Sequence, residues 1–190
     1  MFTALALILA NAQAAEPPSI DAAPAEVHPL PSIEEAHFRI AEIDTAMFFA
    51  AFEGCEPAEV REHITEDFRM VHDLGGIVAD SGDGFAAMLE EGCQQRRQGG
   101  PQEGYKNRRL LVPGSDSVTP LGEWGVLHRG WHTFHEWRDK EQRWEIVGGG
   151  RFLNLYQWMP EEGRFRMQET LSLDHGAAKS HRPEDRRPGG

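Results

Sequence analysis

Histidine has the widest chemical range of the residue types in this chain, because it titrates near neutral pH and also binds metals. Five histidines fall within expected strands or at their ends: His72, His128, His132, His135 and His175. His128 and His132 have the same parity within one strand, which places their side chains on one face of the sheet and that of His135 on the other. Any chemistry of these rings therefore depends on which face lies inside.

Asp73 directly follows one of these histidines. His72 has the parity of Phe68 and Met70, the apolar set of its strand, so we expect His72 to point inward with that set. Asp73 should point the opposite way unless the strand has already begun to turn at Gly75.

Glu169 is the anomalous residue of the last expected strand, residues 164–173. Alternation places it on the same side as four apolar residues: Phe165, Met167, Leu171 and Leu173. That side should be buried, and a buried carboxylate needs a partner or a raised pKa. Glu169 is thus either a general base or half of a structural ion pair with Arg151 or Arg109, and structural ion pairs are the more common case.

A metal site is a weaker hypothesis. It would combine four residues: His72, His132, Asp174 and His175. No pair among them has a spacing that enforces convergence, and on a strand His128 and His132 are about 13 Å apart at 3.3 Å per residue. Gly148–Gly150 precedes a strand and is more plausibly a bulge or hinge than a phosphate loop. With no nucleophile elbow or Cys/His signature present, we expect no metal and no cofactor.

Composition limits the classes of function. The 190 residues are 39% hydrophobic and 26% charged, which suits one globular domain with a core. The net charge of −12 repels phosphate backbones and excludes nucleic acid as a partner.

Cys55 and Cys93 could pair in an oxidising compartment, but nothing in the sequence brings their Cα atoms within bonding range. We expect two separate buried cysteines.

The two ends of the chain differ from its middle. Residues 1–15 contain a short apolar run followed by small residues, which predicts a signal peptide and a periplasmic or secreted protein. A mis-assigned start would instead leave the protein in the cytoplasm. The run is too short to span a bilayer, so no membrane partner is expected. Residues 16–31 carry five prolines and predict an extended tether, and residues 176–190 predict a disordered tail.

Residues 32–175 remain as the folded domain, with helical spacing first and strand alternation afterwards. Ser32 and Glu35 form a capping box for a helix that Gly54 ends. Two further helices are expected at about 57–64 and after Ser81. The expected strands follow the order 68–73, 107–112 with 117–121, 124–137, 150–159 and 164–173. This order predicts an α+β domain in which three N-terminal helices pack on one face of a curved antiparallel sheet.

Five short motifs occur in a recognisable order: Phe68–Gly76, Arg109–Gly114, Gly130–Phe134, Arg151–Gln157 and Leu171–His175. Together they resemble the SnoaL-like group called domain of unknown function 4440, in the nuclear-transport-factor-2-like superfamily that contains ketosteroid isomerase. The resemblance implies a cone-shaped, cystatin-like roll with a pocket at its wide end, and a homodimer formed through the sheet. This chain departs from the group at Asn154, Glu169 and Leu173, where relatives carry histidine, arginine and tyrosine.

Two functions are compatible with these observations. The first is an exported domain that binds an unknown small molecule in an apolar pocket with a few polar groups. The alternative is a proton-transfer enzyme, an isomerase, dehydratase or cyclase, acting on a small apolar substrate. The catalytic candidates are His72, Asp73, His132 and Glu169. The further pocket candidates are Arg109, Asn154, Asp174, His175, Phe134 and Tyr156. The binding function is slightly favoured, because no nucleophile, cofactor motif or paired carboxylate stands out.

Overall fold

The computed structural model describes residues 27–176. The predicted signal peptide, most of the predicted tether and nearly all of the predicted tail lie outside these residues. The last residues of the tether are packed on the domain, because the Trp158 indole donates a 3.0 Å hydrogen bond to the carbonyl of His28. Within the described part of the chain, no helix is both long enough and apolar enough to cross a membrane.

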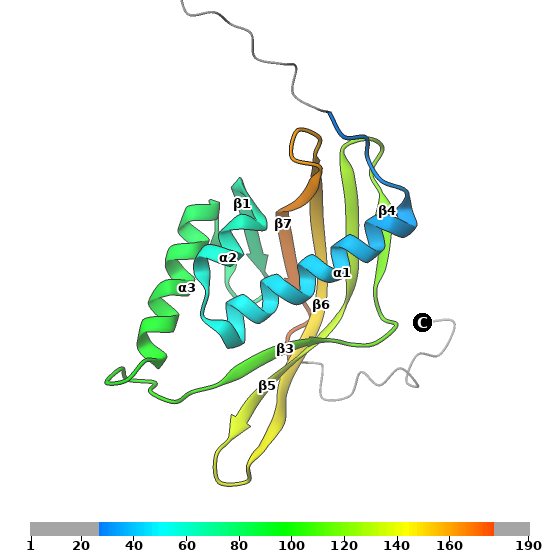
Figure 1. Ribbon diagram of the computed structural model, residues 1–190. Helices are drawn as coiled ribbons and strands as arrows, with labels where there is room; N and C mark the ends of the chain where they lie inside the picture. The colour runs from blue at the N-terminus through cyan, green and yellow to red at the C-terminus, as the bar shows by residue number, and fades with distance from the viewer. Residues whose placement is uncertain (1–26, 177–190) are drawn as a thin grey trace, which may run out of the picture.

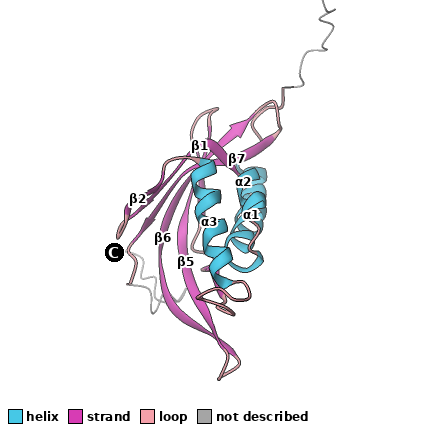
Figure 2. Ribbon diagram, turned by 90° about the vertical axis from the view of Figure 1, so that its left-hand side faces the viewer, coloured by secondary structure: helices cyan, strands magenta, loops and turns pink. Residues whose placement is uncertain are grey.

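The helices come first and the long strands last. The helical elements are α1 (Ile33–Phe49), the π-helical turn η1 (Ala50–Gly54), α2 (Pro57–Glu62) and α3 (Gly82–Arg96). The strands are β1 (Ile64–His72), β2 (Gly76–Ala79), β3 (Asn107–Leu111), β4 (Ser117–Pro120), β5 (Gly125–Arg138), β6 (Arg143–Met159) and β7 (Arg164–Leu173). The helices cover one face of a curved sheet, as Figure 2 shows, and α1 crosses its strands obliquely (Figure 1).

Local sequence signals explain where the helices begin and end. Ser32 caps α1 by accepting the backbone N–H of Glu35 at 3.3 Å, as predicted, while the Glu35 carboxylate pairs with Arg39 instead of completing the capping box. Ser81 caps α3 in the same way, through the N–H of Gly84. After α1, the η1 turn ends at Cys55, whose φ of 53° is left-handed.

The sheet is mixed and largely antiparallel, with the strand order β2-β1-β7-β6-β5-β3 and β4 paired to β5. The predicted meander of β5, β6 and β7 is confirmed by its antiparallel pairing. The prediction of an antiparallel sheet holds for every pairing except that of β1 with β7, which is parallel. Local alternation cannot show this pairing, which joins the first and last strands of the domain.

Strand β6 begins at Arg143, earlier than the predicted start at Gly150. Its first residues belong to the part of the β5–β6 hairpin that extends beyond the helices (Figure 1). Because no helix covers this part, it needs no alternation of apolar and polar residues. Phe134 pairs with Gly148 and His135 with Ile146, so a bulge lies beside the glycine run, as predicted.

A bulge in β7 reverses the alternation that the sequence suggested. Tyr156 pairs with Met167, but the preceding residue, Leu155, pairs with Glu169, so Gln168 is an extra residue in β7. A one-residue shift moves every later side chain to the opposite face. The prediction that Glu169 shares the buried face is therefore wrong, and Thr170 and Ser172 face inward in its place.

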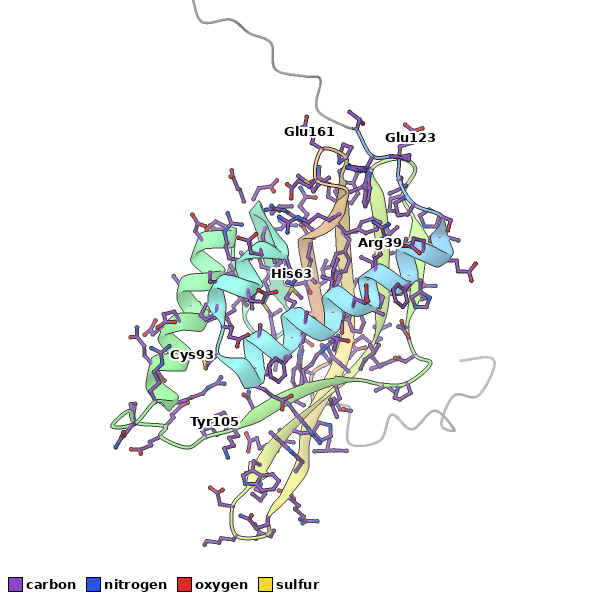
Figure 3. All side chains as sticks on the ribbon, in the orientation of Figure 1. Arg39, His63, Cys93, Tyr105, Glu123 and Glu161 are labelled. Atoms are coloured by element: carbon purple, nitrogen blue, oxygen red, sulfur yellow. A yellow bond between two sulfur atoms is a disulfide. The ribbon has the colours of Figure 1, made fainter. Side chains whose placement is uncertain are left out.

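Cys55 and Cys93 form a disulfide with a Cα–Cα distance of 5.6 Å, so the prediction of two separate cysteines is also wrong. The bond joins the end of η1 to α3, and Figure 3 shows Cys93 where α3 lies beside the end of α1. Helix packing brings together two residues that are 38 positions apart, and spacing alone carries no sign of this.

Removing the disulfide should lower the free energy of unfolding. Closing a loop of this length stabilises a fold by about 3–4 kcal/mol, because it limits the unfolded chain. The Cys55→Ser/Cys93→Ser variant, or the native protein with a reductant, should lose about this amount in urea denaturation. The reductant should have no effect on the double variant. Equal stability with and without the reductant in the native protein would contradict the prediction.

Candidate functional site

A cavity of about 200 Å³ lies between the helices and the inner face of the sheet. Most of its lining is apolar: Met47, Phe48, Ala51, Phe52, Val60, Phe68, Met70, Val78, Phe85, Met88, Leu89, Phe134, Phe152 and Met167. The polar side chains that line it are those of His132 from β5 and of Thr170 and Ser172 from β7. The cavity is thus largely apolar, and its few polar groups come from the sheet.

A buried ion pair stands behind this wall. Asp44 of α1 contacts the guanidinium of Arg109 on β3, and their side chains are 6% and 1% exposed. The guanidinium also packs on the rings of Phe48 and Phe152, with its carbon 3.7 and 4.9 Å from the ring centroids. Two buried charges are tolerated here because each neutralises the other.

Arg109 fixes the proton of His132. Its Nε–H donates to Nδ1 of His132 over 3.2 Å, and because arginine can only donate, Nδ1 must be the acceptor. Burial, and then the positive charge of Arg109, lower the pKa of His132 to about 2. The ring is therefore neutral at physiological pH and carries its single proton on Nε2. No acceptor for this proton occurs among residues 27–176.

Gly150 leaves room beside this proton. A Cβ placed on Gly150 would lie 3.4 Å from Nε2 of His132, 3.4 Å from Nε2 of His175 and 2.7 Å from the carbonyl oxygen of Leu173. A side chain here would collide with the backbone, so glycine allows the two imidazoles to face one space. The glycine run therefore also has a packing role within β6.

A second polar group lies where β1 and β7 end. Nδ1 of His175 is 2.7 Å from Oδ1 of Asp73, and Nε2 of the same ring is 3.0 Å from Oγ of Ser172. The backbone N–H of His175 donates to Oδ2 of Asp73. Burial alone would raise the pKa of Asp73, but the hydrogen bonds from His175 outweigh it and lower that pKa. His72 stacks on His175 with ring centroids 3.9 Å apart.

His72, Asp73 and His175 are also the described residues whose spacing could hold a metal ion, with ligand atoms within 4.8 Å of one another. Two imidazoles and a carboxylate suit a transition metal. Nδ1 of His72, however, accepts the N–H of Leu74 at 3.2 Å, and both nitrogens of His175 have partners within the chain. Hydrogen bonds alone therefore account for this geometry.

Other buried polar residues lie on β5 and β6. Thr170 donates to Oδ1 of Asn154 at 2.6 Å, and Tyr156 is fully buried, which raises the pKa of its phenol well above the ordinary value. Burial lowers the pKa of His128, whose Nε2 lies 3.4 Å from a carboxylate oxygen of Asp116. These groups add polar side chains to the interior of the domain beside the cavity.

The structure brings some of the predicted site residues together and separates others. His132 and Phe134 line the cavity, Arg109 supports His132, and His72, Asp73 and His175 converge. Asn154 and Tyr156 are buried in β6. Glu169 pairs with Arg69 over 2.8 Å rather than with Arg151 or Arg109, and Asp174 pairs with Arg151 in an exposed position.

Sequence reasoning missed Asp44 and Ser172. Asp44 lies between Ile40 and Met47 on the apolar face of α1, so an acidic residue at that position was a visible signal. Simple alternation along residues 164–173 places Ser172 on the face opposite Phe165, which is wrong, because the bulge at Gln168 leaves no mark in the pattern of apolar residues.

No protein-family model and no curated protein matches this sequence. Solved structures do match its shape. A nuclear-transport-factor-2-like protein with a cystatin-like fold from Novosphingobium aromaticivorans gives a TM-score of 0.59 at 14% identity, over 78% of this chain and 86% of that one. The chain has the nuclear-transport-factor-2-like fold.

Two more structures give a similar result. ActVI-ORFA from Streptomyces coelicolor has a TM-score of 0.59 at 11% identity, over 74% of this chain and 96% of that one. Rv3472, a protein of unknown function from Mycobacterium tuberculosis, has a TM-score of 0.57 at 12% identity, over 72% and 69% of the two chains. At such identities the nuclear-transport-factor-2-like fold is shared, and function must come from the site.

Removing one charge of the buried pair should destabilise the domain. Asp44→Asn leaves the Arg109 cation without a counter-charge in an apolar setting, which should cost about 3–5 kcal/mol. Glu35→Ala breaks the exposed pair with Arg39 and should cost about 0–1 kcal/mol. Urea denaturation of both variants tests this, and equal losses would contradict the burial argument.

Neutral His132 should make stability depend on pH. Its folded pKa of about 2 lies below the ordinary value of 6.5, so between these values the unfolded chain binds a proton that the folded chain does not. Stability is therefore lost as pH falls below about 6.5, by at most about 1.4 kcal/mol per pH unit for this one group. His132→Phe should show a flatter decline between pH 7 and pH 5 than the native protein. An unchanged slope in His132→Phe would refute the assignment.

Proposed function

We propose that this protein binds a small, neutral, largely apolar molecule that carries one hydrogen-bond-accepting oxygen. The observation behind the proposal is the Nε2–H of His132, a buried donor on the wall of an apolar cavity, without an acceptor in the described part of the chain. A buried donor without an acceptor costs about 1–3 kcal/mol. A carbonyl or ether oxygen in the cavity would remove this cost.

The cavity supports a ligand of modest size. Pockets for drug-sized molecules measure about 300–1,000 Å³, and this one is about 200 Å³. A molecule of one or two rings, or a short branched chain, fits such a volume. Its apolar body would contact Met47, Phe68 and Phe85, and its oxygen would lie against the sheet wall.

The charges around the cavity favour a neutral ligand over an anion. Arg109 is the cation behind His132, and Asp44 already neutralises it. His132 itself is uncharged, because its pKa is far below neutrality. An anionic ligand would lose its hydration and find no unpaired positive charge among these residues.

The alternative of a proton-transfer enzyme has less support. Of the two candidates for a general base, Glu169 pairs with Arg69, and Asp73 accepts the backbone N–H of His175. Neither lines the cavity. Three further proposals rest on the sequence: that the protein belongs to the SnoaL-like group within this fold, that it forms a homodimer, and that it is exported. The bond between Cys55 and Cys93 is compatible with export, because disulfides persist in oxidising compartments.

A matched pair of ligands tests the binding function. The ketone 1-tetralone should bind about tenfold more tightly than the hydrocarbon tetralin, since only the ketone accepts the His132 proton. Dissociation constants from NMR titration of the full-length protein give this ratio. His132→Leu should remove the preference for the ketone, and His135→Leu, which changes a ring of the opposite face, should retain it.

Ala51→Phe provides a test of location. The larger side chain fills part of the cavity, so both ligands should bind weakly to a variant that remains folded by circular dichroism. Failure of both ligands to bind the native protein, or equal affinity for the two, would contradict the proposal.

A further inference from the structure

Three side chains beside the cavity have the relative positions of a nucleophile, its base and the group that orients the base. Oγ of Ser172 is 3.0 Å from Nε2 of His175, whose Nδ1 is 2.7 Å from Oδ1 of Asp73. We propose that Ser172 is an acyl-accepting nucleophile and that the protein hydrolyses esters of small apolar acids. This inference rests on the proposed function, because the same cavity would hold the acyl group.

The carboxylate of Asp73 sets the tautomer that the reaction needs. Because a carboxylate is an acceptor, Nδ1 of the neutral His175 ring must carry the proton. Nε2 then has a free electron pair, which accepts the hydroxyl hydrogen of Ser172. This is the arrangement in which a histidine activates a serine, and such a triad is recognised by geometry and roles rather than by sequence order.

The sheet holds the nucleophile in a fixed position. Ser172 is 5% exposed and lies between Phe152 of β6 and His72 of β1 in the sheet register. Side chains supported on both sides by neighbouring strands keep their geometry better than those on loops. Ser172 also lines the cavity, so a ligand held there would lie beside its side chain.

The turn after β7 folds back, so that the His175 side chain lies against Ser172 of β7. Asp174 has a φ of 58°, a left-handed conformation that is uncommon for a residue other than glycine. Its carboxylate pairs with Arg151, which secures the turn. His72 stacks on the His175 ring from the end of β1. Backbone strain retained at such a position is common at functional sites, and here it brings the base to Ser172.

His132 would stabilise the charge that develops during acyl transfer. Its Nε2–H and the Nε2 of His175 lie at equal distances from the point above Gly150 where a Cβ would sit. A carbonyl carbon attacked by Ser172 would place its oxygen on this wall of the cavity. A donor already positioned in an apolar site stabilises an oxyanion more strongly than water does.

The proposed steps use only an ester and water. Oγ of Ser172 bonds to the carbonyl carbon while its proton passes to Nε2 of His175, and the carbonyl oxygen becomes an oxyanion. The ester C–O bond then breaks, and the leaving alkoxide takes the proton from His175 as an alcohol. Water attacks the acyl-serine and gives a proton to His175. The acyl–Oγ bond breaks, and that proton returns to Ser172 as the carboxylic acid leaves.

Covalent labelling and turnover of the full-length protein test the proposal together. A fluorophosphonate should add to Ser172, as located by peptide mass spectrometry, and 4-nitrophenyl butyrate should be hydrolysed. Ser172→Ala should abolish the label, and His175→Ala should lower the hydrolysis rate about 10²–10⁴-fold. Ser115→Ala, which removes a hydroxyl that bonds to the backbone of Trp131 instead of to a histidine, should leave both readouts unchanged.

Asp73 is a positioning residue, so its variant needs a separate readout. Asp73→Asn should lower the rate of acylation with little change in KM, and it should alter the pH profile of the rate, because the amide no longer fixes the tautomer of His175. A purely structural role would change thermal stability without altering that profile.

Three results would overturn the proposal. They are labelling at a residue other than Ser172, hydrolysis at the native rate in Ser172→Ala, and complete loss of hydrolysis with EDTA, which would assign the reaction to a metal held by His72, Asp73 and His175. Binding of 1-tetralone to Ser172→Ala separates the two proposals. A native protein that binds the ketone but is neither labelled nor active contradicts the nucleophile alone, whereas one that also fails to bind the ketone contradicts both.

Discussion

The contact between Asp44 and Arg109 is the interaction on which the interior of this domain depends. Neither charge is stable in an apolar environment alone, so the pair forces α1 to lie against β3 at this point. Because the guanidinium donates to Nδ1 of His132, the same pair determines where that ring carries its proton. One ion pair therefore links the packing of a helix on the sheet to the chemistry of the cavity wall.

The cavity combines an apolar lining with a few buried polar groups. The helices contribute only apolar side chains to it, which makes the space suitable for a hydrophobic body. The sheet contributes His132, Thr170 and Ser172, each held by strand pairing on a curved surface. These polar groups lie among apolar side chains of the same sheet, such as Phe134 and Phe152, and the helices cover that face of the sheet (Figure 2). A ligand in such a site is oriented by few contacts, and each contact carries much of the specificity.

The bulge at Gln168 has a larger effect on the site than any single side chain. Without it, Glu169 would point inward beside Met167, and Ser172 would point outward. The extra residue places the carboxylate beside Arg69 on the outer face and brings a hydroxyl to the cavity. The left-handed Asp174 then returns His175 to that hydroxyl. Two local irregularities of the backbone thus assemble a polar group that regular strand geometry would have dispersed.

The sequence by itself determined the α+β order, the cap at Ser32 and the β5–β7 meander, because these depend on residues close together in the chain. It also singled out His72, Asp73, His132 and His175 as candidates, since histidine and aspartate are chemically distinctive wherever they fall. Only the tertiary structure decided which of them meet. The parallel pairing of β1 with β7 joins residues about a hundred positions apart, and the bulge reverses a parity that the apolar pattern implied. The bond between Cys55 and Cys93 and the contact of Asp44 with Arg109 likewise arise from helix packing, which has no signature in local spacing.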